Sequence, residues 1–379
     1  MKRTWYKKQI ENALARGRSV ALLGLRQSGK TVLVKELVDR YSFHVFNLED
    51  SADLARLADP RSALASLKGT VVIDGIQERP DILPVLESLL NRHPAPAKFL
   101  LLGSMAPDFL KKLSESQAGH LEVIEMDGLD LSETGHKEGK HLWTRGGLPL
   151  SLLAHSDVES FSWRKNVLQP QLEEDIRRHG FDLSQEAMPK FWTMLALSHG
   201  KVWNAAPFAD AFRISEDVVN RYLGILTDCF IVRQIQPWQA DVKKRQVETP
   251  KVYIRDVGLL HAFLRLRTRA EVIRHPICSA SWEWFVLDQV IHLVEPDSVH
   301  FWAICNGPDL DLVFSKNGRM YGVEVKRSDA PTLTTTMHIA IDDLKLERLV
   351  IIYPGERRYE LHKKASAIPF GKIPDGILE

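Results

Sequence analysis

Residues 24–31, GLRQSGKT, are the part of the sequence whose residue types and spacing most clearly suit a chemical task. They fit the pattern G-x-x-x-x-G-K-[ST], with Gly24, Gly29, Lys30 and Thr31 at the defined positions. Glycines let backbone N–H groups curl around a phosphate, and a helix that begins here presents its positive end. The lysine reaches the β- and γ-phosphates, and the threonine hydroxyl ligates Mg²⁺. The motif therefore predicts a site for ATP with Mg²⁺.

Two further residues, Asp74 and Ser104, are expected to complete this site. Asp74 ends the apolar run TVVID. In proteins with this motif, the carboxylate that holds Mg²⁺ also stands at the end of an apolar strand. Ser104 follows LLLG, where it could sense the γ-phosphate or position water, although Gly-Ser after a strand is also ordinary turn chemistry. The predicted Mg²⁺ ligands are Thr31 and Asp74, and the predicted nucleotide-binding residues are Gly24, Arg26, Gln27, Ser28, Gly29, Lys30, Thr31, Asp74 and Ser104.

Short apolar runs alternate with helical patterns around these residues. The runs favour buried parallel strands, and the segments between them carry apolar residues at helical spacing. This alternation predicts an α/β unit with a parallel sheet, of the P-loop NTPase type, over residues 1–130. The predicted strands are residues 19–23, 43–48, 70–74 and 98–102, and the predicted helices include residues 4–17, 32–38 and 82–90.

The rest of the sequence divides into three segments. Residues 131–185 are polar and are expected to form a helical lid or linker. Residues 186–270 contain three helical patterns, the third preceded by Ser215 as a helix cap, and then two strands. This order is the outline of a winged helix-turn-helix. Residues 271–379 form another mixed α/β unit.

Composition excludes several classes of protein. The 379 residues include 50 Lys and Arg against 49 Asp and Glu, so the net charge is +1 and a chain-wide polycation is excluded. The three cysteines lie far apart and form no C-x-x-C pair, which suits a reducing cytosol. The amino terminus is charged, and no apolar run approaches the roughly 20 residues that span a bilayer. We therefore expect a cytoplasmic protein with no membrane partner.

A second set of chemically suited residues lies in the last segment. Glu283 falls on a predicted helix, Asp311 on a strand, and Glu324 and Lys326 on one face of the next strand. An acidic residue followed by E-x-K is the outline of a PD-(D/E)xK nuclease, in which carboxylates bind Mg²⁺ and the lysine stabilises charge at the cleaved phosphate. Asp309 shares the strand face of Asp311. The alternative is a surface ion pair or a relic site without cleavage activity.

Double-stranded DNA is a candidate partner for the winged helix. The helix after Ser215 carries Asn220 and Arg221, residues 243–245 are KKR, and Arg233 lies on the predicted wing. Such a helix would enter the major groove while basic side chains contact the phosphates. Two acidic residues at the start of the same helix oppose this, and the alternative is that the winged helix only packs domains together.

Seven stretches spread along the chain match the pattern of one family, and they are GLRQSGKT, VVIDGIQERPDILPVLESL, LLLGSMAPDFLKKLSESQAGH, LWTRGGLPLS, RYLGILTDCFIVRQIQPW, KVYIRDVGLLHAF and GVEVKRS. By these stretches nearly the whole chain resembles the bacterial and archaeal AAA-superfamily ATP-binding proteins that carry a C-terminal domain of unknown function. The resemblance implies an ATPase core, a winged helix and, over 271–379, a restriction-endonuclease-like fold. AAA-type ATPases generally act as rings, so the resemblance also leaves a homo-oligomer open.

Three positions depart from the family pattern. Gly75 stands directly after Asp74, where the family usually has glutamate. His120 and Glu174 each stand where the family usually has arginine. A missing general base typically lowers a rate by about 10²–10⁴-fold, and a missing arginine finger by about 10³–10⁵-fold. Neither loss removes the contacts that hold ground-state nucleotide.

These departures predict a protein that binds ATP–Mg²⁺, hydrolyses it slowly and acts as a nucleotide-dependent switch. Glu78, Arg177 and Arg178 are candidates to substitute for the missing groups. Two other functions stay open. One is a Mg²⁺-dependent nuclease regulated by nucleotide at the P-loop, and the other is a non-enzymatic DNA-binding scaffold in which both sites are relics.

Overall fold

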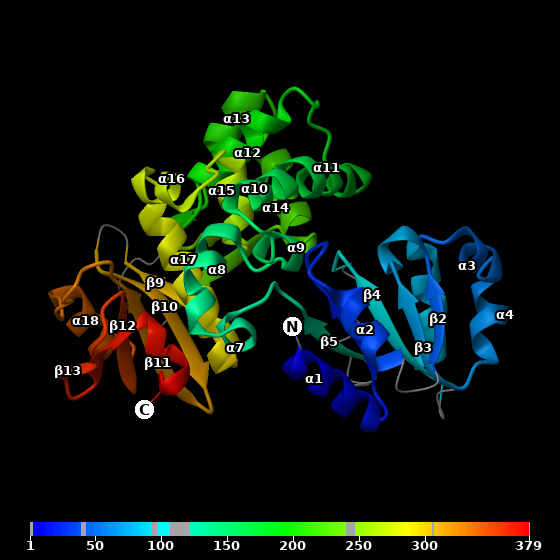
Figure 1. Cartoon of the computed structure of the whole chain (residues 1–379), viewed down its shortest axis with the longest axis horizontal. Helices are drawn as coiled ribbons and strands as arrows, with labels where there is room; N and C mark the ends of the chain where they lie inside the picture. Colours follow the sequence, from blue (N-terminus) through cyan, green and yellow to red (C-terminus); the bar gives the residue numbers. More distant parts are fainter. Residues whose placement is uncertain are drawn as a thin grey trace.

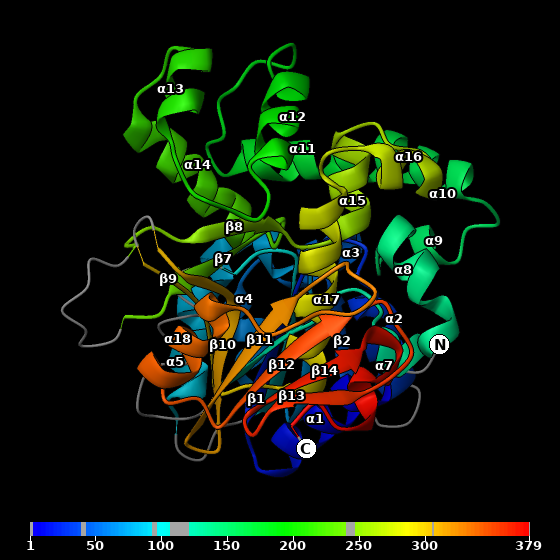
Figure 2. The same cartoon turned by 90° about the vertical axis from the view of Figure 1, so that its left-hand side faces the viewer.

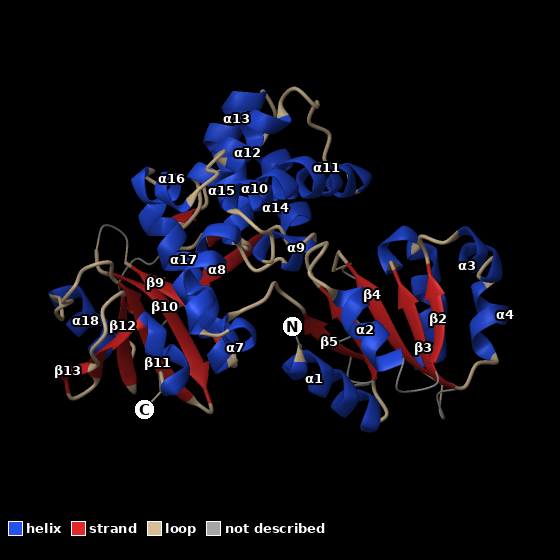
Figure 3. Ribbon diagram, viewed as in Figure 1, coloured by secondary structure: helices blue, strands red, loops and turns tan. Residues whose placement is uncertain are grey.

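The computed structural model describes residues 3–38, 43–92, 97–106, 121–239, 247–304 and 307–378. They form an amino-terminal sheet unit (blue to cyan), a helical region (green to yellow) and a carboxyl-terminal sheet unit (orange to red) (Figure 1). The two strand-rich units lie on opposite sides of the view, with most helices above and between them (Figure 3). Within the described ranges, no helix has both the length and the apolarity needed to cross a bilayer.

The amino-terminal unit is a five-stranded parallel sheet in the order β2-β3-β4-β1-β5. This confirms the predicted parallel α/β core, and β5 is a strand that the sequence analysis missed. The strands are β1 (Ser19–Leu23), β2 (Phe43–Asn47), β3 (Gly69–Asp74), β4 (Ala97–Gly103) and β5 (Leu121–Glu125). The helices are α1 (Thr4–Ala15), α2 (Lys30–Val38), α3 (Ser51–Arg56), α4 (Pro60–Ala65) and α5 (Leu83–Leu90), with 3₁₀ turns η1 (Ile76–Glu78) and η2 (Pro80–Ile82).

Alternate residues of the strands pack on opposite faces of this sheet. Val20 and Leu22 of β1 belong to the cluster formed with α1 and α2, whereas Ala21 and Leu23 belong to the cluster formed with α5. All five residues of β1 are buried, because the strand lies inside the sheet between β4 and β5 and both faces are covered. The P-loop, which follows β1, therefore begins at the end of a buried strand.

The helical region begins with a chain of short helices that returns toward the P-loop. They are α7 (Leu131–Thr134), η3 (His136–Glu138), α8 (Gly139–Arg145), α9 (Pro149–Leu152), α10 (Asp157–Trp163), the π-helical η4 (Arg164–Leu168) and α11 (Gln169–Arg178). Arg164 in η4 is fully buried and donates to the Gly258 carbonyl, which ties this chain of helices to the following segment.

The next segment has three helices and three short strands. They are α12 (Met188–Leu197), β6 (Lys201–Val202), α13 (Ala206–Phe212), α14 (Glu216–Asp228), β7 (Val232–Pro237) and β8 (Lys251–Ile254), followed by α15 (Val257–Phe263) and α16 (Arg269–Arg274). Ser215 caps α14 as predicted, since its hydroxyl accepts from the Val218 N–H at 3.3 Å.

The strands of the carboxyl-terminal unit form one sheet with β6, β7 and β8 of the preceding segment. Nine strands run in the order β13-β14-β12-β11-β10-β9-β7-β8-β6, and the parallel pairing of β7 with β9 joins the two segments. Figure 2 shows the carboxyl-terminal strands face-on, with α17 behind them. The elements are α17 (Cys278–Val294), β9 (Ser298–Ala303), β10 (Asp309–Lys316), β11 (Arg319–Val325), α18 (Thr335–Asp343), β12 (Arg348–Tyr353), β13 (Tyr359–His362), β14 (Ala365–Pro369) and η5 (Phe370–Asp375).

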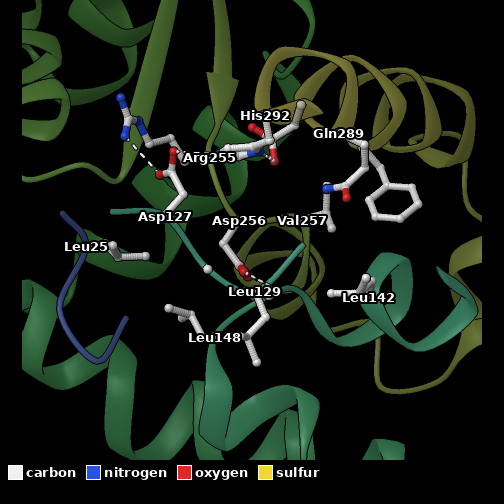
Figure 4. A pocket seen from close by; sticks show the side chains of 14 residues that line it. Leu25, Asp127, Leu129, Leu142, Leu148, Arg255, Asp256, Val257, Gln289 and His292 are labelled. Atoms are coloured by element: carbon white, nitrogen blue, oxygen red, sulfur yellow. Dashed lines mark hydrogen bonds and ion pairs between the residues drawn. The ribbon is translucent and has the colours of Figure 1, made fainter. Parts of the chain in front are cut away.

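Charged side chains from the amino-terminal and carboxyl-terminal parts meet around a cavity of about 40 Å³ beside the P-loop (Figure 4). Asp127, which follows β5, pairs with Arg255 after β8 (Oδ1–Nη1 3.0 Å). His292 of α17 approaches the other Asp127 oxygen at 3.1 Å and Asp288 at 3.5 Å. We call these four residues the interface charge cluster. Their side chains are 11–21% exposed, so each charge depends on its partners.

The partners set the protonation of this cluster. Burial favours a neutral Asp127, but Arg255 and His292 outweigh it and hold the pKa of that carboxyl well below its usual range. Burial likewise opposes a charged His292, but Asp288 and Asp127 raise its pKa to about 9. The imidazole is therefore a cation at neutral pH, placed between two carboxylates.

We predict that the stability contributed by His292 declines as pH rises. The pKa of His292 is 6.5 in the unfolded chain and about 9 in the folded chain. The stability that the charged imidazole contributes is therefore complete below pH 6.5 and is lost as the pH rises through about 9. The free energy of unfolding of the native chain minus that of His292→Gln should therefore fall by about 1–3 kcal/mol across this window. Urea denaturation at a series of pH values measures this difference.

His141→Gln is the control, because His141 is half exposed and forms a surface pair with Glu138. An exposed pair contributes little to stability, so the free energies of unfolding of the native chain and His141→Gln should stay within about 1 kcal/mol of each other. Parallel pH profiles for the native chain and His292→Gln would show that His292 is not a buried cation.

Candidate functional site

The loop over residues 24–29 leaves β1 and leads directly into α2. Gly24 has φ +157°, and a Cβ placed there would lie 2.1 Å from the Met126 carbonyl oxygen, so only glycine fits. Lys30 donates to the carbonyls of Gly24 (2.8 Å) and Leu25 (3.0 Å), within the curve of the loop. Burial lowers the pKa of Lys30 to about 8, against the attraction of Asp74. A phosphate would replace those carbonyls as a stronger partner for the ammonium.

Thr31 and Asp74 are brought together as the sequence predicts. The Thr31 hydroxyl donates to Asp74 Oδ2 at 2.7 Å, although the two residues are 43 positions apart. Strand β4 lies between β1 and β3, and Ser104 follows it at the carboxyl ends of these parallel strands, where Thr31 and Asp74 also lie. The Ser104 N–H donates to the Gln77 side chain at 3.3 Å. Hydroxyl and carboxylate oxygens at this edge are suited to Mg²⁺.

A cleft of about 400 Å³ contains these groups. Its cationic side chains are Arg26 and Lys30, and its acidic side chains are Glu49 and Asp74. Seven of the nine predicted nucleotide-binding residues line it. Gly24 does not, and Ser28 is fully buried beneath Lys30. Gly75, which the sequence analysis singled out as a departure from the family pattern, also lines it. The lining residues that the sequence analysis missed are Val32, Asn47, Glu49, Gln77, Gly103, Pro149 and Leu150.

Gly75 has a conformational reason to be glycine. Its backbone is left-handed (φ +85°, ψ +36°), and it opens the 3₁₀ turn η1. A Cβ would make ordinary contacts, the nearest at 3.6 Å to Leu48, so space does not exclude a side chain. The cost of a larger residue is conformational, about 1–2 kcal/mol for a left-handed L-residue. The cleft consequently lacks a carboxylate directly after Asp74.

The candidate substitutes for the missing groups are not in the cleft. Both carboxylate oxygens of Glu78 accept from Arg178 Nη1 (3.1 and 2.9 Å), and Arg178 Nη2 donates to Glu174 at 2.5 Å. Arg177 is exposed and does not line the cleft. His120 lies outside the described residues. Glu78 and Arg178 thus bind each other across η1 and α11.

Helix α11 also contacts the P-loop itself. Arg26 pairs with Asp175 at 2.6 Å and with Glu49 at 3.3 Å. Gln27 donates to the Gln171 side chain at 3.4 Å. Burial raises the pKa of Asp175, while the hydrogen bond and charge of Arg26 oppose that rise. Nothing in the local sequence marks Asp175 as a P-loop partner, because the contact joins residues 149 positions apart.

The residues predicted for nuclease chemistry form one acidic neighbourhood. Burial and Asp311 raise the pKa of Glu283 to about 8 and that of Glu324 to about 7, and burial also raises the pKa of Asp311. Lys326 pairs with Glu324 at 2.5 Å, and Tyr253 donates to Glu283 at 3.3 Å. Within the described ranges, no three His, Cys, Asp or Glu side chains are arranged to hold a metal ion.

Asp309 and Asp311 have different surroundings. Asp309 is exposed, whereas Asp311 Oδ2 accepts the Val325 N–H at 2.8 Å across the strands. The structure thus places Asp311 beside Glu324, whereas Asp309 is exposed.

The two α14 side chains predicted to contact DNA interact with other residues of the protein. Asn220 accepts from the Trp203 indole N–H at 2.8 Å, which holds it against its own segment. Arg221 is 58% exposed and lies 3.8 Å from Asp182. It is the only Lys or Arg on α14, so this helix face adds no concentrated positive charge.

The wing prediction needs correction at Arg233. Its strand β7 is interior to the nine-stranded sheet, between β9 and β8, rather than at a free edge. Arg233 lies 3.9 Å from Asp288 of α17 and belongs to the surroundings of the interface charge cluster. Residues 243–245 lie outside the described residues.

Comparison with known proteins assigns the regions of this chain. An AAA domain matches residues 16–135, a domain of unknown function (DUF8612) matches 137–270, and a second domain of unknown function (DUF4143) matches 278–373. Among solved structures, the Walker-type ATPase paby2304 of Pyrococcus abyssi aligns at 13% identity and a TM-score of 0.47, over 69% of this chain and 95% of that one. The Thermotoga maritima RuvB Holliday junction branch migration motor aligns at 16% identity and a TM-score of 0.29, over 61% and 89%.

Sequence relatives match over almost the full length. The uncharacterized proteins Rv2008c of Mycobacterium tuberculosis and Mb2031c of Mycobacterium bovis are each 40% identical over 365 residues, which cover 96% of this chain and 83% of theirs. The chain therefore belongs to the family of these mycobacterial proteins, and its amino-terminal region is an AAA domain.

Proposed function

We propose that this chain binds ATP with Mg²⁺ at the P-loop, hydrolyses it slowly and uses the bound nucleotide as a switch. One observation carries the proposal: Lys30 and the Thr31–Asp74 pair line a common cleft, whereas Gly75 offers no general base. The groups suited to bind nucleotide thus line the cleft, while the carboxylate expected directly after Asp74 is absent. The AAA domain match over residues 16–135 supports the choice of nucleotide.

The cleft residues divide into two parts that suit the two ends of a nucleotide. Lys30 and the start of α2 are suited to the phosphates, with Thr31 and Asp74 as the residues that would hold Mg²⁺. Val32 and Leu150 are 65% and 57% exposed, and with Pro149 they form an apolar wall of the same cleft. Burial of these surfaces against a base would stabilise the bound nucleotide.

The switch is proposed to act through α11. Arg26 lines the cleft and simultaneously pairs with Asp175, so a phosphate competes with Asp175 for the same guanidinium. Gln27 contacts α11 through a second hydrogen bond. Binding of nucleotide would therefore change how firmly the helical region is held against the P-loop.

Lys30→Ala tests the binding function. We expect it to weaken binding of ATP–Mg²⁺ by about 10- to 100-fold, because a charge-assisted contact to phosphate contributes about 1.5–3 kcal/mol. Isothermal titration calorimetry with ATP and Mg²⁺ measures the dissociation constant. Lys35→Ala is the matched control, since Lys35 is exposed on the same helix and does not line the cleft. Equal affinity in the native chain and Lys30→Ala would exclude the P-loop as the nucleotide site.

Gly75→Glu tests the proposed cause of slow hydrolysis. A carboxylate at this position should raise steady-state ATP turnover by about tenfold or more, even with some loss of stability from its left-handed backbone. Gly75→Ala is the control, because it carries the same backbone strain without the carboxylate. The proposal fails if the native chain already turns over ATP rapidly. In that case, Glu49→Gln and Glu78→Gln would be compared. Loss of turnover in Glu49→Gln, with turnover kept in Glu78→Gln outside the cleft, would identify Glu49 as the general base.

A second candidate function is a Mg²⁺-dependent nuclease at the acidic neighbourhood. The favouring observation is that Glu324 Oε2 is buried and has no hydrogen-bond partner among the described residues, beside two other carboxyls whose pKa values are also raised. Carboxyls in this condition are the ones that a bound cation would relieve. The side chains as they stand are not arranged for a metal ion, so this function requires them to move.

Lys326→Ala tests this second candidate. If the site cleaves DNA, plasmid nicking in the presence of Mg²⁺ should occur with the native chain and be lost in this variant, because Lys326 is the cation beside Glu324. Lys363→Ala, an exposed lysine of the same unit, should retain the activity. Agarose gel electrophoresis of supercoiled plasmid measures nicking. Persistent nicking in Lys326→Ala, or none in the native chain, would exclude the proposed site.

A further inference from the structure

A second large cavity, of about 480 Å³, lies between the helical region and the carboxyl-terminal unit, away from the P-loop. Its walls come from α8, the start of α16, α17, the loop after β11 and η5. Figure 1 shows α8 beside α17, with α16 above them. None of its residues belongs to the predicted sites, so neither the P-loop nor the acidic neighbourhood explains it.

Positive charge from three separate elements converges on this cavity. Lys140 is on α8, Arg269 begins α16, and Arg327 follows β11. Asp329 is the single carboxylate in the described lining, and none of the three cations has a carboxylate within 4.0 Å in the part of the chain that the structure describes. Arg327 instead donates to the Cys278 thiol at 2.7 Å, which is a weak acceptor. An anion would relieve the repulsion among these cations.

Aromatic rings form the wall next to these cations. Trp143, Trp282 and Phe370 all line the cavity. Trp282 packs against Trp143 (centroids 5.2 Å apart, edge to face) and against Phe370 (4.9 Å). The Arg327 guanidinium lies 5.8 Å from the Trp143 ring. Because the rings already pack on one another, a ligand would lie against the wall they form rather than between them.

The combination identifies the chemistry of the ligand. Arginine and lysine side chains bind phosphate, and aromatic walls stack on planar bases. A cavity of this volume is within the range of sites for small organic ligands. An acidic peptide would use the cations but would leave the aromatic wall without a partner. We propose that this cavity is a binding site for a nucleoside phosphate, either free or at the end of a single nucleic-acid strand.

The test uses the full chain carrying Lys30→Ala, so that binding at the P-loop does not contribute. The probe is a fluorescently labelled, 5′-phosphorylated oligothymidylate of about ten nucleotides, and its binding is followed by fluorescence anisotropy. Arg269→Gln with Arg327→Gln should weaken binding by about tenfold or more and should reduce its dependence on salt. Both side chains are exposed, so the double variant is expected to fold.

Arg274→Gln is the matched control, because Arg274 is an exposed arginine of the same helix, α16, and does not line the cavity. It should bind like the parent. Competition by thymidine 5′-monophosphate would show that a free nucleotide suffices, whereas competition by unlabelled strand alone would show that the site takes a strand end.

The proposal is overturned if the probe does not bind, if the double arginine variant binds as tightly as the parent, or if an oligoglutamate peptide competes as well as the strand. Since every arm carries Lys30→Ala, none of these outcomes depends on whether the P-loop binds ATP.

Discussion

The ion pair between Asp127 and Arg255 is the interaction on which the relation between the regions depends. It joins the residue after β5 to the residue after β8, and His292 of α17 adds a second cation to the same carboxylate. Arg3 donates to the main-chain carbonyl of Asp127 and also to that of Ser28 in the P-loop. A buried carboxylate is costly without such partners. Its full pairing therefore requires β8 and α17 to be held together, and Arg3 connects this cluster to the P-loop.

The P-loop is therefore attached to the rest of the protein at two places beside the cleft. On one side the P-loop is attached, through Arg3 and Asp127, to the sheet that continues into the carboxyl-terminal unit. On the other side it contacts α11 through Arg26 and Asp175, a pair that lies at the cleft and is open to competition. The first attachment involves no cleft residue, so a ligand does not compete for it. A nucleotide would therefore act on α11 first, while the interface charge cluster stays intact.

Local sequence patterns were sufficient to predict which residues meet at the P-loop cleft. The glycine and lysine spacing of residues 24–31 and the strand that ends at Asp74 each carry their own signal, and the structure places them together. Strand β5 was missed because it is an edge strand with two glutamates among five residues. Glu49 and Asp175 were missed for another reason, because no local pattern marks them. The fold brings each of them to Arg26 from a distant part of the sequence, and it also places Glu49 in the cleft.

Gly75 shows why a departure from a family pattern needs a structure before it can be interpreted. From the sequence alone it is the absence of a carboxylate. In the structure it is also a left-handed residue that starts η1 and leads the chain to Glu78, whose carboxylate is bound by Arg178 of α11. The substitution thus removes a side chain from the cleft and favours a turn that brings another carboxylate to the helix that contacts the P-loop. Under the proposed function, slow hydrolysis and the ion pair between η1 and α11 would have one structural origin, the left-handed Gly75.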